Sequence, residues 1–187
     1  MLYQDLRDQN TEAILNSGVQ RIVTADPHAF NALKKDYSGL PPVEHISQTI
    51  VRQIRSGKLQ LKAAEESSKV YVYHDACYLG RHNNVYDAPR DAIDSIPGIN
   101  RIEMTGNCRD RSFCCGGGGL MLFYEPEEEQ RMGVLRVDMA AKAGANVIVT
   151  ACPFCLVNME DAIKVAGLEG KMEAIDLCEL VAQHLAA

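Results

Sequence analysis

The chain has 187 residues, of which 47% are hydrophobic and 24% charged, a balance typical of a globular protein with a buried core. Its formal net charge of −6 argues against nucleic acid or an anionic membrane surface as the main partner. No uncharged apolar run reaches the roughly 20 residues of a membrane span, and the first residues lack a signal-peptide pattern. These features predict a cytoplasmic protein with no membrane span of its own.

Strand-like and helical segments alternate along the chain. In chain order, the patterns predict a helix (3–18), a strand (19–25), two helices (30–36 and 47–56), a strand (69–74), a helix (87–96), a strand (100–105), a helix (125–144), a strand (145–151) and two helices (155–166 and 177–185). This alternation predicts an α/β fold of parallel strands in Rossmann-like lobes.

An internal repeat indicates two related lobes. Residues 18–30 (GVQRIVTADPHAF) align without a gap with residues 144–156 (GANVIVTACPFCL). Any two buried strands look alike, but the shared Thr-Ala-x-Pro after each strand favours a true repeat. We therefore expect residues 1–66 to form one lobe and residues 67–187 the other. The first lobe is shorter ahead of the repeat, which predicts a truncated copy belonging to a longer polypeptide.

The two copies differ in their thiols. Asp26 aligns with Cys152, and Ala29 aligns with Cys155. A carboxylate and a methyl group cannot replace a pair of thiolates. We therefore expect the first lobe to be degenerate and the second lobe to carry the chemistry.

Seven cysteines in a protein expected in a reducing compartment point to metal ligation rather than to disulfides. Five of them follow a regular pattern: Cys77, 36 residues, Cys114-Cys115, 36 residues, and Cys152-x-x-Cys155. Each group follows a predicted strand, so parallel strands would gather all five sulfurs at one edge of a sheet. The other two are interpreted as a loop thiol (Cys108) and a buried apolar side chain (Cys178).

Five thiolates exceed what the common sites need, because structural zinc takes four ligands and a cubane cluster takes four cysteines. Adjacent cysteines point in different directions, so Cys114 and Cys115 can hold two metal ions of one cluster. Backbone N–H groups of the glycines that follow can approach inorganic sulfide, and we expect three to contribute: Gly116, Gly117 and Gly118. A zinc module, and a thioredoxin-like exchanger at Cys152-Pro-Phe-Cys155, remain alternatives.

The pattern Cys-x36-Cys-Cys-Gly-x35-Cys-x-x-Cys resembles the cysteine-rich CCG domain of heterodisulfide reductases and of iron–sulfur subunits of glycolate and lactate oxidation. YHDACYLGRHNNVYDAPRDAIDSIPGI (73–99) is similar to the family's stretch around its first ligand, although Ala76 stands where proline is expected. DPHAFNALKKDY (26–37) is similar to the Cys-Pro-His-Cys segment of a preceding copy. The resemblance implies one noncubane [4Fe-4S] cluster held by five ligands: Cys77, Cys114, Cys115, Cys152 and Cys155.

The resemblance also implies a function. The expected role is an iron–sulfur oxidoreductase component, heterodisulfide reductase-like and active within a complex. It would reduce a small disulfide, or exchange electrons with a quinone or thiol carrier. Expected partners are flavin or ferredoxin-type iron–sulfur subunits, through which the chain could lie peripherally at a membrane. The alternatives are a structural zinc module and a simple relay subunit of a flavin-dependent 2-hydroxy-acid dehydrogenase complex.

Histidines flank the first expected ligand. His74 and His82 are candidate proton donors, since splitting a disulfide releases two thiols that need protons. His28 aligns with Phe154 and is expected to pack near the cofactor pocket. Three arginines are candidates for offsetting the negative charge of a cluster: Arg81, Arg109 and Arg111.

Overall fold

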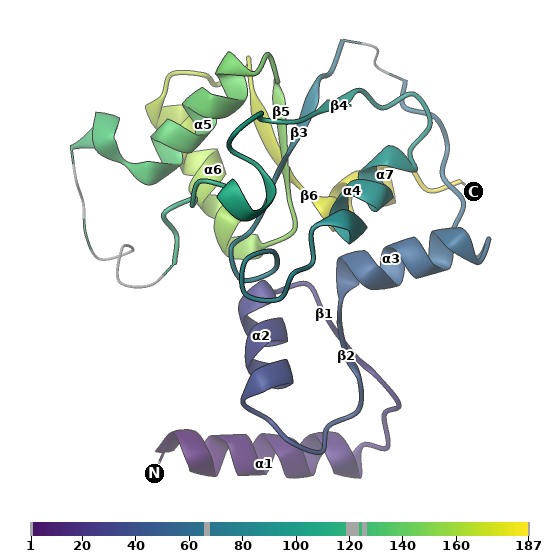
Figure 1. Ribbon diagram of the computed structural model, residues 1–187. Coiled ribbons are helices and arrows are strands. Elements are labelled where there is room, and N and C mark those ends of the chain that lie inside the picture. Colours follow the sequence, from purple (N-terminus) through teal and green to yellow (C-terminus); the bar gives the residue numbers. More distant parts are fainter. Residues whose placement is uncertain (1, 66–67, 119–123, 125–126, 187) are drawn as a thin grey trace.

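The computed structural model describes residues 2–65, 68–118, 124 and 127–186, and within them the named strands form two parallel sheets (Figure 1). The smaller sheet pairs β1 (Ile22–Thr24) with β2 (Val43–His45). The larger sheet has the strand order β4 (Arg101–Ile102), β3 (Tyr71–His74), β5 (Val147–Thr150), β6 (Glu173–Asp176). All these neighbouring strands are parallel, so the predicted Rossmann-like α/β fold is confirmed.

The α-helices lie close to the positions that the sequence predicts. They are α1 (Leu2–Asn16), α2 (Pro27–Lys35), α3 (Ile46–Arg55), α4 (Asp87–Asp94), α5 (Met132–Lys142), α6 (Pro153–Val165) and α7 (Leu177–Gln183). The helix expected at 125–144 is the exception, because α5 begins only at Met132. A 3-10 turn at Glu128–Gln130 precedes α5, Arg131 has an extended backbone, and residues 125–126 lie outside the described part.

The larger sheet is covered by helices on both faces. Figure 1 shows α5 and α6 on one side of the sheet and α4 and α7 on the other. Strands β3 and β5 are buried along their whole length, which explains why their residues are apolar or aromatic up to the last position of each strand, His74 and Thr150. Val72, Ile148 and Val149 at the centre of these strands are at most 1% exposed.

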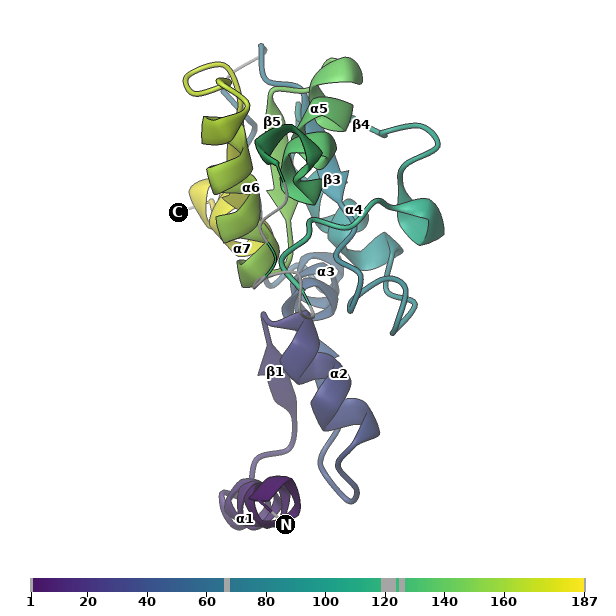
Figure 2. The same cartoon turned by 90° about the vertical axis from the view of Figure 1, so that its left-hand side faces the viewer.

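The smaller sheet and its helices form the lower part of the molecule. Helix α3 packs against α4 and α7 and so joins this part to the larger sheet. Helix α1 lies at the far end and buries none of its residues, as both views show (Figures 1 and 2). The expected lobe boundary between residues 66 and 67 falls outside the described residues and stays a prediction.

The parallel register brings the ends of several strands to one edge. His74 at the end of β3 pairs with Thr150 at the end of β5, and Thr150 pairs with Asp176 at the end of β6. The chain leaving β3 therefore starts beside the chain leaving β5. The first carries Cys77, and the second carries Cys152.

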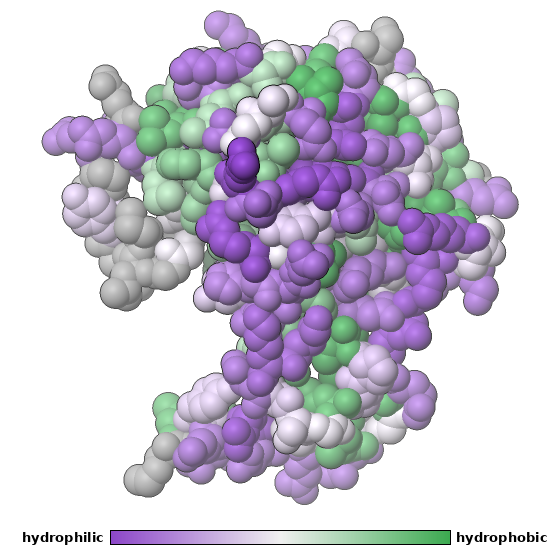
Figure 3. Space-filling model, viewed as in Figure 1, coloured by the Kyte–Doolittle hydropathy of each residue, from purple (hydrophilic) through white to green (hydrophobic). Residues whose placement is uncertain are grey.

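Hydrophilic residues cover most of the coloured surface on the face shown in Figure 3, and hydrophobic residues appear there in separate patches. Within the described residues, none of the helices combines the length and apolar character needed to cross a lipid bilayer.

Candidate metal centre

The five cysteines of the motif come together in one network of thiols. Contacts between neighbouring sulfurs run in the order Cys77, Cys114, Cys115, Cys155, Cys152. The Sγ atoms of Cys115 and Cys155 are 3.3 Å apart. Cys115, Cys152 and Cys155 are buried, and Cys77 and Cys114 are partly buried. Three separate chain segments thus deliver sulfur to one place.

The glycines after the cysteine pair donate backbone hydrogen bonds to sulfur. The N–H of Gly116 lies 3.4 Å from Sγ of Cys114, and the N–H of Gly117 lies 3.3 Å from Sγ of Cys115. Gly116 has a φ of +85°, and a β-carbon there would come within 2.9 Å of Cβ of Met132. A side chain at position 116 therefore fits neither the backbone nor the space.

The Cys-x-x-Cys segment forms the beginning of α6. Cys152 is the N-cap residue, Pro153 opens the helix, and Cys155 lies in its first turn. The Cys155 thiol and the backbone N–H groups of Cys155 and Phe154 lower the pKa of Cys152, against the opposing effect of burial. The N-terminal end of α6 thus favours the thiolate form of Cys152.

Helix α2 in the lower part begins in the same way. Asp26 is its N-cap, Pro27 follows, and the Asp26 carboxylate accepts hydrogen bonds from the N–H groups of His28 (2.9 Å) and Ala29 (3.3 Å). Asp26 and Cys152 therefore occupy the same N-cap position, each followed by a proline that opens the helix. This agreement in local geometry matches the sequence repeat.

The cysteine pair also favours thiolate formation at one of its members. Hydrogen bonds from the thiols of Cys115 and Cys77, and from the N–H of Gly116, lower the pKa of Cys114 well below that of a free thiol. The pKa values of Cys77 and Cys115 are raised because each interacts with Cys114. The network therefore holds fewer protons than sulfurs, as a metal-binding site requires.

A small pocket opens onto the sulfurs. Its lining is formed by Pro27, His28, Ala76, Cys77, Tyr78, Cys115, Gly117, Gly118, Cys152, Phe154 and Cys155. The donor set consists of soft thiol sulfurs with backbone N–H groups beside them, which fits an iron–sulfur cluster, and four of these thiols would also suit zinc.

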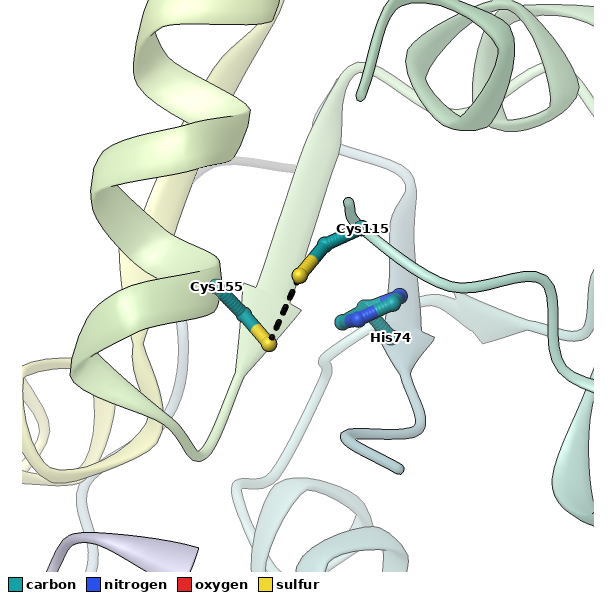
Figure 4. Close-up of side chains that lie close together, drawn as sticks. All are labelled: His74, Cys115 and Cys155. Carbon is teal, nitrogen blue, oxygen red and sulfur yellow. Dashed lines mark hydrogen bonds between the residues drawn. The ribbon is translucent and has the colours of Figure 1, made fainter. Parts of the chain in front are cut away.

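His74 lies beside this network on the buried side. A ring nitrogen of His74 and the Sγ atoms of Cys115 and Cys155 all lie within 4.8 Å of one another (Figure 4). Arg136 donates from Nε to Nδ1 of His74 at 3.0 Å. Burial first, and then the charge of Arg136, lower the pKa of His74 to about 3, so its ring is neutral at neutral pH.

His82 lies outside the pocket, in a row of aromatic rings at its mouth. Its exposed ring stacks on Tyr78 with centroids 4.6 Å apart, and Tyr78 lies 4.3 Å from His28. The ring of His28 meets Phe154 edge-on at 5.2 Å. His28 is therefore packed at the pocket, as its alignment with Phe154 predicts, and its Nδ1 lies 3.0 Å from the Asp26 carboxylate.

A buried network of ion pairs holds together the loops that carry Cys77 and the Cys114-Cys115 pair. Arg90 of α4 makes two hydrogen bonds to Asp75, at 2.6 and 2.8 Å, and two more to Glu103. Asp75 also accepts a hydrogen bond from the backbone N–H of Arg109 at 2.7 Å. The side chains of Arg90 and Asp75 are 4% and 2% exposed, respectively. This network joins the turn around Cys77 to the segment before Cys114.

The three arginines singled out from the sequence make other contacts. Arg81 donates to the Ser112 carbonyl, Arg109 pairs with Asp87, and Arg111 is exposed. The buried cation near the sulfurs is Arg136, which the sequence reasoning missed. The signal was present, since Arg136 interrupts an otherwise small and apolar stripe at helical spacing: Gly133, Arg136, Val137 and Ala140.

Cys108 and Cys178 lie outside the thiol network. Cys108 precedes the 3-10 turn at Arg109–Arg111, and burial raises its pKa. Cys178 lies in the first turn of α7 and packs against the core, where burial raises its pKa to about 12. The loop position of Cys108 agrees with the interpretation from the sequence, whereas Cys178, expected to be buried, is only partly buried.

Known proteins are similar to this chain over nearly its whole length. The iron-sulfur-binding oxidoreductase FadF of Bacillus subtilis, described as probable, is 35% identical over 98% of the chain. EtfAB:quinone oxidoreductase of Syntrophomonas wolfei is 35% identical over 96% of the chain. A component of the dihydromethanophenazine:CoB--CoM heterodisulfide reductase of Methanosarcina barkeri is 34% identical over 97% of it.

The relatives are longer proteins. The chain spans 26% of the length of the first two and 45% of the third. Residues 71–160, which include all five network cysteines, match the cysteine-rich domain family CCG. Residues 71–160 of the chain therefore belong to the CCG cysteine-rich domain family.

Proposed function

We propose that the chain is an iron–sulfur redox subunit whose cluster is a noncubane [4Fe-4S] group held by Cys77, Cys114, Cys115, Cys152 and Cys155. The observation that carries the proposal is the continuous network of five thiols at one sheet edge. Zinc is the alternative metal, but a tetrahedral zinc site would leave one of the five sulfurs without a metal.

The residues around the sulfurs have distinct proposed roles. Gly116 and Gly117 direct N–H groups at sulfur, and Gly118 leaves the pocket wall open. The first turn of α6 supplies further N–H groups. A bound cluster would supply one-electron chemistry and an iron site for a substrate sulfur. The protein would hold the negatively charged cluster, exclude water from the buried side of the cluster and leave its other side open.

The substrate is proposed to be a small disulfide, or a quinone or thiol carrier. The names of the similar reductase and quinone oxidoreductase proteins support this class, and the aromatic rings at the pocket mouth suit a partly apolar reactant. His82, exposed at the mouth, remains the candidate proton donor. Buried and neutral, His74 suits hydrogen-bond donation better than proton transfer.

Redox partner subunits are part of the proposal. The relatives include a heterodisulfide reductase component and an EtfAB:quinone oxidoreductase, whose names support redox partner subunits, and flavin or ferredoxin-type iron–sulfur proteins are the partners proposed for this chain. A relative from Chromohalobacter salexigens, 35% identical over 98% of this chain, is called a probable membrane-anchored ferredoxin. We extend the proposal to a place beside a membrane through partner subunits. We also propose residues 1–66 as a degenerate CCG lobe and residues 67–187 as the intact one.

Metal analysis of cysteine variants tests the function. The full chain, prepared without oxygen, is expected to contain about four irons and about four sulfides. Cys114→Ser/Cys115→Ser should lose most of both, because it removes the centre of the thiol network. Cys178→Ser is the matched control and should retain them, since Cys178 lies on α7 outside the network. Stoichiometric zinc without sulfide in the wild type, or unchanged iron in the double variant, contradicts the proposal.

A further inference from the structure

Arg136 is a fully buried cation whose hydrogen bonds within the described residues go to uncharged groups. Its side chain, 0% exposed, donates to the Asn107 carbonyl (2.8 Å), to Nδ1 of His74 (3.0 Å) and to the Ser112 hydroxyl (3.4 Å). Burial lowers its pKa to about 10, which still leaves it charged at neutral pH. A buried charge without an opposite charge is strongly destabilising, so a compensating anion is expected nearby.

The groups that act electrostatically on Arg136 identify that anion. They are Asp75 and the thiols of Cys108, Cys115 and Cys155. Asp75 is already bound by Arg90 through two hydrogen bonds, and it also accepts the N–H of Arg109. Arg90 also pairs with Glu103, so Asp75 still offsets part of the Arg136 charge, and the sulfurs of Cys115 and Cys155 offset a further part.

The contact between Arg136 and His74 fixes the position of the imidazole proton. A guanidinium group can only donate hydrogen bonds, so Nδ1 of His74 must be the unprotonated acceptor. Because Nδ1 accepts this hydrogen bond, the ring carries its single proton on Nε2. With Nδ1 engaged, Nε2–H is the group that can donate toward the sulfurs. In this tautomer His74 has no lone pair left to bind a metal ion.

Figure 4 shows the edge of the His74 ring facing the gap between Cys115 and Cys155, which come from the loop and from α6. We infer that Arg136 and His74 form a relay that presents a hydrogen-bond donor and a buried positive charge to the Cys115–Cys155 side of the cluster, and so raises its reduction potential. This inference rests on the proposed function. Arg136 is a positioning residue, because it acts through His74.

Reduction potentials of the loaded, full-length protein test the relay. Positive charge and hydrogen bonds to sulfur both stabilise the reduced, more negative cluster. Arg136→Met and His74→Leu should therefore lower the midpoint potential. His74→Gln should restore much of the lost potential, because the glutamine amide can place an N–H near the position of Nε2. In the His74→Leu background, Arg136→Met should shift the potential less than it does in the wild type.

Lys142→Met is the matched control. Lys142 lies at the exposed end of the same helix, α5, and carries the same charge, but solvent screens it. Its replacement should leave the potential nearly unchanged. The inference is overturned if Arg136→Met shifts the potential no more than Lys142→Met does, or if it shifts it equally with and without His74.

A second measurement needs no metal. In the metal-free protein at neutral pH, ring ¹⁵N chemical shifts of His74 should report the Nε2–H tautomer, and Arg136→Met should abolish this preference. A ring protonated at Nδ1 in the wild type overturns the relay. A protein that binds no iron overturns the proposed function and, with it, the effect on potential. The ring measurement distinguishes that result from a failure of the Arg136–His74 contact itself.

Discussion

Position 116 admits only glycine, for two independent reasons. The φ of +85° is unfavourable for any residue with a β-carbon, and that carbon would come within 2.9 Å of Met132. The N–H at this position meets the sulfur of Cys114, so a shift of the backbone would also move a donor away from the metal site. Backbone geometry and sulfur chemistry therefore depend on the same glycine.

We predict that Gly116→Ala lowers the free energy of unfolding by about 1–3 kcal/mol and reduces iron uptake. Gly170→Ala is the matched control, because Gly170 also has a left-handed backbone (φ +73°) but no atom lies within 4 Å of its added β-carbon and it lies outside the metal centre, so iron uptake should stay unchanged. Urea unfolding of the metal-free proteins and iron analysis of the loaded ones measure both effects. Equal behaviour of the two variants would contradict the role assigned to Gly116.

At the residue level, the sequence predicts the sulfur ligands better than their surroundings. Two spacings of 36 residues after predicted strands suffice to bring five cysteines together. The buried charges were not predicted, because Asp75 and Arg90 look like ordinary surface residues in a sequence, and only the apolar stripe around Arg136 indicated its burial. Their burial depends on which helix face meets the sheet, and that is decided by contacts distant in the chain.

At the level of elements, ion pairs from α4 connect the residues that directly follow two neighbouring strands, β3 and β4. Arg90 on α4 binds Asp75, which follows β3, and Glu103, which follows β4. Burial alone would raise the pKa of Glu103, but hydrogen bonds and charges from Arg90 and Arg101 outweigh it and lower the pKa to about 2. The ionised form of Glu103 therefore stabilises the fold.

This pKa predicts how the stability of the metal-free protein depends on pH. A glutamate titrates near 4.3 in an unfolded chain, so the folded state holds the proton less tightly. The contribution of Glu103 is complete above about pH 4.3 and is lost as the pH falls toward 2. Glu103→Gln should flatten the decline in urea-unfolding free energy over this range, whereas Glu160→Gln on the exposed face of α6 should not. If the unfolding free energy of Glu103→Gln declines with falling pH as it does in the wild type, the role assigned to the ion pairs of Glu103 is refuted.

Helix and strand positions were largely predictable, because strong periodicity and capping residues agree with the tertiary structure. Residues 3–18, for example, predict a helix that the structure places at Leu2–Asn16. The late start of α5 was not predictable from the acidic run before it. Arg131 has an extended backbone, so Glu127 and Glu128 do not form the first turn of that helix.

At the scale of the whole molecule, the lower part contributes one wall of the metal centre. Pro27 and His28 at the start of α2 line the same pocket as the cysteines. His45, buried at the start of α3, has Nε2 3.2 Å from the Ala25 carbonyl and so holds the turn before α2 in place. The N-terminal part of the chain, which has no thiol pair at the start of α2, thus still shapes the site of the five cysteines. The repeat in the sequence predicts the similar elements, but not this shared pocket.

Anomalous diffraction at the iron edge tests the central claim most directly. Crystals of the full chain, reconstituted with iron and sulfide and grown without oxygen, are expected to show iron bonded to Sγ of all five network cysteines. We predict one cluster whose irons are bonded to Cys114 and Cys115, to Cys77, and to Cys152 and Cys155 at the start of α6. A single tetrahedral metal bound by four of these sulfurs, or iron that leaves Cys77 and Cys114 without a bond, would contradict this prediction.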